Sequence, residues 1–299
     1  MGKKLLFVYN PKAGKAMIKN KLADILDIFA REGYEITIVP TQKRGDAREV
    51  VEGRRDSYEL VVCSGGDGTL DEVVTGMIRS GIRTPIGYIP AGSTNDFGGS
   101  LSLPKKMVRA AETIMEGRNF PCDVGSFNDD IFVYIAAFGL FTDVSYETGQ
   151  DMKNILGYMA YLLEGMKRLS SVRSFPMKVS WEGNQVEENF IFGMITNSVS
   201  VGGFKNITGK HVKLDDGVFE VTLIKSPRNP VELNNIMLSL LNRNIDTNAM
   251  YCFRTAELVL ESKESVAWTL DGENGGSHTK VVIRNICKGM EIRVGKLPV

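Results

Sequence analysis

A short apolar run that ends in a glycine-rich turn constrains this chain more than any other feature. Residues 60–63 are apolar, and the turn that follows reads Gly65-Gly66-Asp67-Gly68-Thr69. Glycine lacks a Cβ, so the backbone can approach a ligand closely, and successive N–H groups in such a turn bind anions. A helix predicted from Leu70 adds its N-terminus, which also favours anions. An aspartate would repel a bare phosphate, so Asp67 indicates a bound Mg²⁺ or a proton-accepting role; the plainer alternative is an ordinary strand-to-helix turn.

Before residue 120, strands and helices alternate along the chain. Short loops between such elements predict a mostly parallel sheet covered by helices on both faces, with ligands beyond the carboxyl ends of the strands. Three loops rich in glycine or polar residues follow strands, at 10–15, 64–69 and 91–96, and are predicted to converge on one crevice. The expected strands are 5–9, 34–39, 60–63 and 86–89, and the expected helices are 16–31, 46–55, 70–79 and 107–116.

From about residue 121 the pattern is rich in short strands separated by turn residues. This spacing predicts an antiparallel sandwich or barrel, interrupted by helices at 152–169 and 230–241. The first of these helices is apolar nearly all round, which is typical of buried core, with the lining of a lipid cleft as the alternative. The expected strands are 124–127, 131–138, 177–181, 189–195, 219–224, 254–261, 265–270, 280–286 and 290–294.

Composition excludes several classes of protein. The 299 residues carry 36 Lys and Arg and 36 Asp and Glu, so there is no global basic field to hold nucleic acid or an anionic membrane. The longest apolar run, 131–141, is well short of the roughly 20 residues that span a bilayer. The 4 cysteines are widely spaced, which favours reduced thiols and a cytoplasmic location. Only 2 histidines are present, which argues against zinc chemistry and a histidine-based triad.

Four further motifs could carry chemistry, and each has a plainer alternative. The segment Asn10-Pro11-Lys12-Ala13-Gly14-Lys15 offers backbone N–H groups and lysines but lacks Walker A spacing, so it could be a plain turn. The hydroxyl-rich segment 90–97 suits phosphate or ribose contacts, or helix caps. The segment Asp215-Asp216-Gly217 fits a cation loop or a solvated turn. The segment Asp271-Gly272-Glu273 follows a strand, and Asp-Gly is common in hairpin turns.

Together, the order and spacing of these five motifs resemble the diacylglycerol kinase catalytic-domain family, in its soluble bacterial branch of diacylglycerol and related lipid kinases. The resemblance covers nearly the whole chain. It implies an α/β plus all-β fold, with an N-terminal three-layer α/β domain like those of phosphofructokinases and NAD kinases and a C-terminal β-sandwich domain. The implied division is a nucleotide-binding domain at 1–122, a lipid and metal domain at 123–294, and a tail at 295–299.

The resemblance also implies roles for individual residues. Asp67 would support a catalytic Mg²⁺, and Glu273 would accept the proton of the acceptor hydroxyl. A structural Mg²⁺ would be held by the Lys213 carbonyl, Asp216 and the Val218 carbonyl. ATP would be bound by Asn10, Pro11, Lys12, Ala13, Gly14, Thr41, Gly65, Gly66, Asp67, Gly68, Thr69, Leu70, Asp71 and Ser93 or Thr94.

The implied activity is ATP- and Mg²⁺-dependent phosphorylation of diacylglycerol or a similar lipid. The lipid would be presented at a membrane, with peripheral contact at its inner face; a homodimer is allowed and no nucleic acid is expected. Two alternatives remain open: a lipid-binding protein of the same fold with little kinase activity, and a kinase for a different hydroxyl acceptor. The chain departs from the common family pattern at Asp71, Thr75, Ser93 and Gly98-Gly99-Ser100.

Overall fold

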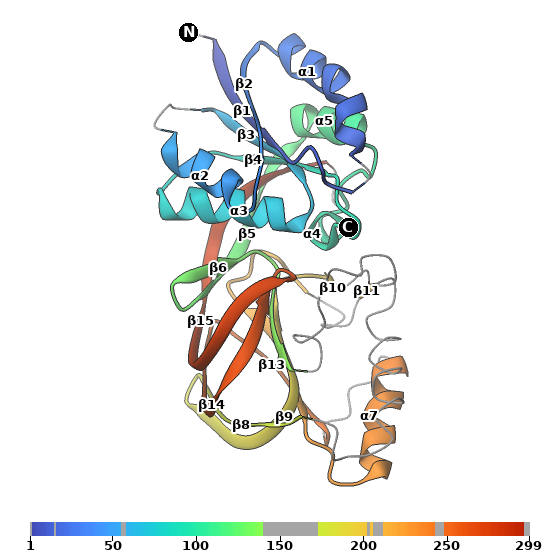
Figure 1. The fold of residues 1–299 in the computed structure, drawn as a ribbon, viewed down its shortest axis with the longest axis vertical. Helices are drawn as coiled ribbons and strands as arrows, with labels where there is room; N and C mark the ends of the chain where they lie inside the picture. The colour runs from blue at the N-terminus through green and yellow to red at the C-terminus, as the bar shows by residue number, and fades with distance from the viewer. Residues whose placement is uncertain are drawn as a thin grey trace. The chain divides into compact units, whose positions relative to one another are not determined.

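A computed structural model describes residues 2–14, 16–54, 58–139, 173–201, 204–205, 212–242 and 248–295 (Figure 1). The chain forms two compact units. The first unit comprises Met1–Val124 together with Cys287–Val299, and the second comprises Gly125–Ile286.

The first unit is a parallel sheet with helices on both faces. Its strands lie in the order β2, β1, β3, β4 and the C-terminal part of β15. All neighbouring strands run parallel, so their carboxyl ends lie along one edge. The strands are β1 (Lys3–Tyr9), β2 (Tyr34–Pro40), β3 (Leu60–Gly65), β4 (Ile86–Pro90) and β15 (Glu273–Val294), and the helices are η1 (Met17–Asn20), α1 (Leu22–Arg31), α2 (Asp46–Gly53), α3 (Asp67–Arg79), α4 (Asp96–Ser100) and α5 (Met107–Glu116).

Two helix pairs cover the faces of this sheet. Helix α1 packs against α5, and α2 packs against α3, on opposite sides of the strands (Figure 1). Phe29 of α1, Ile114 of α5 and Phe7 of β1 are buried together in one apolar cluster. The buried strand β3 has no exposed residue, as expected for a central strand of a parallel sheet. This rigid scaffold fixes the positions of the loops that leave the strands' carboxyl ends.

The second unit is built from antiparallel strands. Its main order is β13, β12, β9, β7, β14, β15, and β8 pairs with both β9 and β14. Phe138, Trp268 and Phe190 belong to its buried core, in which the Phe138 and Trp268 ring centroids lie 4.8 Å apart. The remaining elements are β5 (Arg118–Phe127), β6 (Asp130–Phe132), β7 (Ile135–Gly139), β8 (Phe175–Trp181), β9 (Asn184–Thr196), β10 (Ser200–Val201), β11 (Phe204–Lys205), β12 (Phe219–Lys225), α7 (Pro230–Asn242), β13 (Met250–Thr255) and β14 (Glu257–Leu270).

Several element boundaries differ from the sequence-based expectation. The helix expected at 16–31 begins as a 3₁₀ turn, because Ala16 adopts a left-handed φ of 54° before it. The strand expected at 131–138 is two strands, β6 and β7, separated at Val133 and Tyr134. The apolar helix expected at 152–169 lies outside the described residues.

The end of the chain also differs from the expected division. Cys287–Val294 was expected in the second domain, but these residues lie in the first unit. The reason is that β15 continues into the parallel sheet, where Ile292 pairs with Ile86 of β4. None of the helices in the described ranges is long and apolar enough to cross a membrane.

Candidate active site

Three loops of the first unit meet at the carboxyl edge of the sheet, as their positions after β1, β3 and β4 predicted. Asn10 N–H donates to the Ser64 carbonyl at 2.8 Å, and Ala91 N–H donates to the Gly65 carbonyl at 2.7 Å. Thr41 joins from β2, with its N–H donating to the Tyr9 carbonyl at 2.9 Å. The backbone of these loops is therefore tied together by hydrogen bonds from strand to strand.

Two glycines are required by the close approach of these loops. Gly14 has a φ of +53°, and a Cβ built on it would lie 2.4 Å from the Ala91 carbonyl oxygen. A Cβ on Gly92 would lie 2.6 Å from the Gly66 Cα. Both distances are shorter than side chains tolerate, so the loops after β1, β3 and β4 can touch only because these positions lack a side chain.

The predicted nucleotide-binding residues differ in how they could meet a ligand. Lys12, Ser93 and Thr94 are exposed, so their side chains are accessible. The Lys12 N–H donates to Asn10 Oδ1 at 2.9 Å, which shapes the loop after β1. Leu70 is fully buried, so only its backbone could meet a ligand. Thr69 packs over Gly65, where an added Cβ would lie 2.4 Å from the threonine hydroxyl.

Asp67 lies at the start of α3, where the carboxyl edge of the sheet meets the helix N-terminus. The Asp96 N–H donates to Asp67 Oδ2 at 2.9 Å. The Tyr88 hydroxyl lies 3.5 Å from Asp67 Oδ1. Burial, followed by the charge of Asp67, raises the pKa of Tyr88 well above its usual range. Asp67 therefore accepts a hydrogen bond from Asp96, at the start of α4, and lies close to Tyr88 of β4.

Asp67 and Asp96 together suit a hard cation. Asp96 is only 4% exposed, and both carboxylates lie close enough to Tyr88 for their charges to raise the pKa of its phenol. Carboxylate oxygens are the ligands that Mg²⁺ takes in proteins, with substrate phosphates and water completing the set. In the sequence, Asp96 lies within the hydroxyl-rich segment 90–97, and the spacing of that segment does not reveal the backbone contact with Asp67.

Glu72, a further acidic residue of α3, has a structural role that no sequence motif indicated. Its two carboxylate oxygens accept the N–H groups of Gly45 at 2.7 Å and Ala47 at 3.0 Å. These N–H groups lie at the N-terminus of α2, where Gly45 is the N-cap residue. The first N–H groups of a helix have no acceptor within the helix. Glu72 therefore joins α3 to the start of α2 and stabilises the loop after β2.

In the second unit, Asp271 and Gly272 form a tight turn between β14 and β15, and β15 begins at Glu273. Asp271 and Gly272 both have positive φ angles, 51° and 84°, as in a type I′ turn. Asp271 is buried, and its carboxylate accepts the N–H groups of Val133 at 2.5 Å, Tyr134 at 2.9 Å and Ile135 at 2.9 Å. Asp271 thus holds the main chain between β6 and β7. Glu273 is exposed at the start of β15, where its side chain is accessible to a substrate.

The expected metal loop precedes β12. Lys213 and Val218 flank Asp216 in this segment, and the Asp216 carboxylate contacts the Arg254 guanidinium. Glu220 is 7% exposed, and its Oε1 lies 3.3 Å from Arg254 Nε. Burial raises the pKa of Glu220 to about 7, and the charge of Asp216 adds to this rise while Arg254 opposes it.

The Arg254 guanidinium therefore lies beside two carboxyl groups, those of Asp216 and Glu220. Glu220 Oε2 is buried without a hydrogen-bond partner among the described atoms, which is costly for a polar atom. Within the described ranges, no three Asp, Glu, His or Cys side chains gather into a metal-binding group. A metal here would therefore depend on main-chain carbonyls beside Asp216, which is the ligand set that the resemblance implies.

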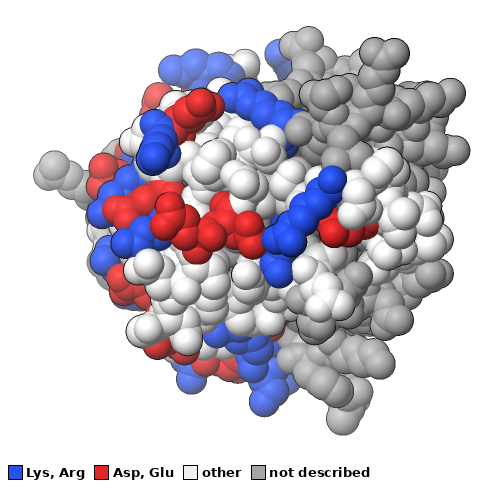
Figure 2. All heavy atoms as spheres, turned by 90° about the horizontal axis from the view of Figure 1, so that it is seen from below, with Lys and Arg blue, Asp and Glu red and all other residues white. Residues whose placement is uncertain are grey.

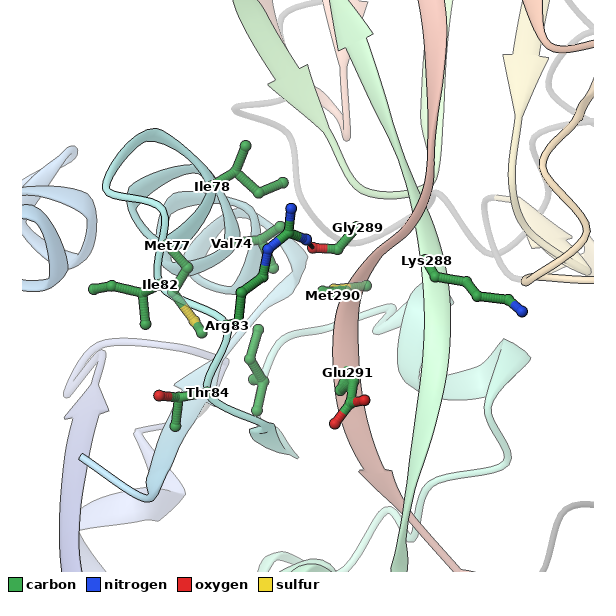
Figure 3. Close-up of a pocket in the computed structure, with 11 residues that line it drawn as sticks. Val74, Met77, Ile78, Ile82, Arg83, Thr84, Lys288, Gly289, Met290 and Glu291 are labelled. Carbon is green, nitrogen blue, oxygen red and sulfur yellow. Dashed lines mark hydrogen bonds between the residues drawn. The ribbon is translucent and has the colours of Figure 1, made fainter. Parts of the chain in front are cut away.

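A small pocket in the first unit lies away from the glycine turns (Figure 3). It has a volume of about 110 Å³ and is lined by the C-terminal half of α3, the start of β4 and residues 288–291. Arg83 reaches across it and donates to the Gly289 carbonyl at 3.3 Å (Figure 3). The predicted ligand loops follow the carboxyl ends of the strands, whereas this pocket lies at the amino end of β4.

Charges on the surface are mixed in sign. Figure 2 shows Lys and Arg interspersed with Asp and Glu on the face that it presents. This pattern agrees with the net charge of zero and gives no broad basic surface there for nucleic acid.

Comparison with known proteins gives matches along both units. Residues 4–127 match the model of the diacylglycerol kinase catalytic domain. Residues 137–293 match the YegS C-terminal NAD kinase beta sandwich-like domain. The predicted fold class, an α/β domain followed by a β-sandwich domain, is confirmed.

Individual proteins are similar over most of the chain. A diacylglycerol kinase of Staphylococcus carnosus strain TM300 is 33% identical over 280 residues, which are 92% of this chain and 90% of the relative. One from Staphylococcus aureus strain JH9 is 34% identical over 281 residues, covering 92% and 88%. A solved structure of a candidate diacylglycerol kinase from Bacillus anthracis strain Sterne has a TM-score of 0.83 at 24% identity, covering 98% and 96% of the two chains.

Proposed function

We propose a specific reaction for this chain, which belongs to the diacylglycerol kinase family and is a kinase. In this reaction, which requires Mg²⁺, the γ-phosphoryl group of ATP is transferred to the hydroxyl of diacylglycerol or a similar lipid. The observation that carries the proposal is the contact of three glycine-containing loops around Asp67 at the carboxyl edge of the parallel sheet. Backbone N–H groups and a helix N-terminus in this arrangement suit the phosphates of ATP.

In this proposal, the loops bind and orient ATP. The close approach of Gly14, Gly66 and Gly92 lets backbone amides reach the phosphates without a side chain in the way. Lys12 and the hydroxyls of Ser93 and Thr94 are exposed and available for phosphate or ribose contacts. Phosphoryl transfer depends largely on such positioning and on electrostatic stabilisation.

Asp67, with Asp96 beside it, would hold Mg²⁺. When bound, the ion neutralises the charge that develops on the transferring phosphoryl group. Glu273 is the proposed general base and would take the proton of the lipid hydroxyl. Asp271 is the other acid of the same turn, but its carboxylate already accepts three backbone N–H groups, so it is less available for proton transfer.

The second unit would contribute the lipid side of the reaction. A structural Mg²⁺ at Asp216, with the Lys213 and Val218 carbonyls, would stabilise the loop before β12. The lipid would be reached by peripheral contact with a membrane surface, and no nucleic acid takes part.

Transfer of labelled phosphate from ATP to a panel of hydroxylated lipids in mixed micelles tests the proposal. We expect a phosphorylated lipid that forms only with Mg²⁺ and fastest with diacylglycerol. ATP binding without product from any lipid of the panel would instead favour a lipid-binding protein of this fold. Faster transfer to another hydroxylated lipid would support the kinase activity and identify that lipid as the preferred acceptor.

A further inference from the structure

A buried phenol lies beneath the proposed ATP site and belongs to none of the predicted motifs. Tyr88, on β4, is 1% exposed. Its hydroxyl lies among three acceptor atoms from three segments of the first unit. These are the Gly65 carbonyl at 3.3 Å, Asn95 Oδ1 at 3.4 Å and Asp67 Oδ1 at 3.5 Å. A phenol has a single hydrogen to donate, so the three acceptors compete for it.

All three acceptor residues also receive a hydrogen bond from a backbone N–H. The Gly65 carbonyl accepts the Ala91 N–H at 2.7 Å, Asn95 Oδ1 accepts the Gly92 N–H at 2.8 Å, and Asp67 Oδ2 accepts the Asp96 N–H at 2.9 Å. Asp67 alone among the three is a carboxylate, and hydrogen bonds to ionised acceptors are roughly twice as strong as those between neutral groups. This difference favours donation from Tyr88 to Asp67.

On the premise of the proposed function, we propose that Tyr88 is a positioning residue, which fixes the plane of the Asp67 carboxylate for Mg²⁺ and ATP. The Asp96 N–H donates to Oδ2 at 2.9 Å, and the Tyr88 hydroxyl approaches Oδ1 at 3.5 Å. The two contacts lie on different oxygens, so together they favour one orientation of the carboxylate about its Cβ–Cγ bond. Through this contact, Tyr88 of β4 would set the orientation of the Asp67 carboxylate at the start of α3.

The substitution Tyr88→Phe tests this, because it keeps the ring and removes the hydroxyl. We expect kcat to fall by about tenfold, which is the size of effect that a lost hydrogen bond to a charged group gives. The half-saturating Mg²⁺ concentration should rise several-fold, while the KM for ATP stays within about twofold, since Tyr88 does not touch the nucleotide. Tyr58→Phe is the matched control: it removes a phenol of the same unit whose oxygen contacts Arg54, and it should change neither quantity.

Turnover is expressed per ATP-binding site, titrated calorimetrically, so a partly unfolded preparation lowers the number of sites and leaves kcat unaffected. A kcat and Mg²⁺ dependence of Tyr88→Phe within twofold of the parent would overturn the inference. The Mg²⁺ dependence of ATP binding is followed in the same titrations. It tests the role of Tyr88 separately from the proposed function, because binding does not require phosphate transfer. If the parent protein binds Mg·ATP but transfers no phosphate, the proposed function fails, and an unchanged Mg²⁺ dependence of binding in Tyr88→Phe would still refute the role of Tyr88.

Discussion

The backbone N–H of Asp96 donates a hydrogen bond to Asp67 Oδ2 at 2.9 Å. The two residues are 29 positions apart, at the starts of α4 and α3. The loop after β4 therefore restrains the carboxylate that follows β3, and a disturbance of one loop should be felt at the other.

Gly92→Ala should disrupt this arrangement. The added methyl would lie 2.6 Å from the Gly66 Cα, so the two loops must separate. We expect the KM for ATP to rise by about tenfold or more, because small displacements of positioning groups are costly. Gly99→Ala is the matched control, since nothing lies within 4 Å of its added Cβ. Equal KM values for the two variants would show that the loop contact is irrelevant to ATP.

Glu273→Gln should slow the chemical step. Glutamine keeps the size of the side chain but cannot take a proton, and a general base contributes typically about 10²–10⁴-fold. We expect kcat to fall within that range while ATP affinity stays within a few-fold. The measurement is steady-state transfer to lipid under conditions in which chemistry limits the rate. A loss in kcat of less than about tenfold would remove Glu273 from the role, and Asp67 would become the candidate.

Asp271→Asn should lower stability instead. The carboxylate accepts three backbone N–H groups, and an amide offers them only one acceptor oxygen. We expect the free energy of unfolding to fall by about 1–3 kcal/mol, the cost of leaving a buried polar group unsatisfied. Urea denaturation measures this, with the exposed Glu187→Gln as control. A variant as stable as the parent would contradict the structural role.

Asp216→Ala should lower the melting temperature and remove protection by Mg²⁺. A metal that binds only the native state stabilises it by linkage. The substitution also breaks the contact with Arg254, so Arg254→Ala serves as the comparison. Arg254→Ala should be destabilised yet retain a shift of its melting temperature with Mg²⁺, whereas Asp216→Ala should lose the shift. If the melting temperature of Asp216→Ala equals that of the parent with and without Mg²⁺, Asp216 is only a turn residue.

Asp46→Asn should show a pH-dependent loss of stability. Hydrogen bonds from the N–H groups of Gln42 and Lys43 hold the pKa of Asp46 below its ordinary value. The folded-state pKa is lowered, so the stabilisation is present above the unfolded-state pKa and is lost as the pH falls through the folded-state value. The melting temperatures of parent and variant should differ near neutral pH and converge in acid. A difference that does not change with pH would show that the charge of Asp46 plays no part.

The regular part of the fold was accessible from sequence because its signals are local. Alternating apolar strands and helices predicted the parallel sheet, and the glycines at 14, 66 and 92 lie in the three loops that were predicted to converge. The long strand β15 was not predicted, since it continues from one unit into the other. Its pairing with Ile86 is a contact distant in sequence, which no local pattern encodes.

The site was predictable in its motifs but not in its supporting contacts. Asp271 was placed correctly in a hairpin turn, yet its bonds to Val133, Tyr134 and Ile135 lie more than 100 residues away in sequence. Glu72 and Tyr88 carry no motif, because each acts through backbone or side-chain atoms of other elements. The roles of Asp67, Glu273 and Asp216 stay predictions until they are measured.

The proposed activity of this chain is phosphorylation of a lipid hydroxyl with ATP. The most direct measurement is transfer of γ-labelled phosphate from ATP to diacylglycerol in mixed micelles, with the parent protein and Glu273→Gln assayed side by side in Mg²⁺ and in chelator. We expect labelled phospholipid from the parent in Mg²⁺, none in chelator, and at most about one hundredth of the parent rate from the variant. Saturable ATP binding by the parent, with no labelled lipid from diacylglycerol or any other hydroxylated lipid, would contradict the claim.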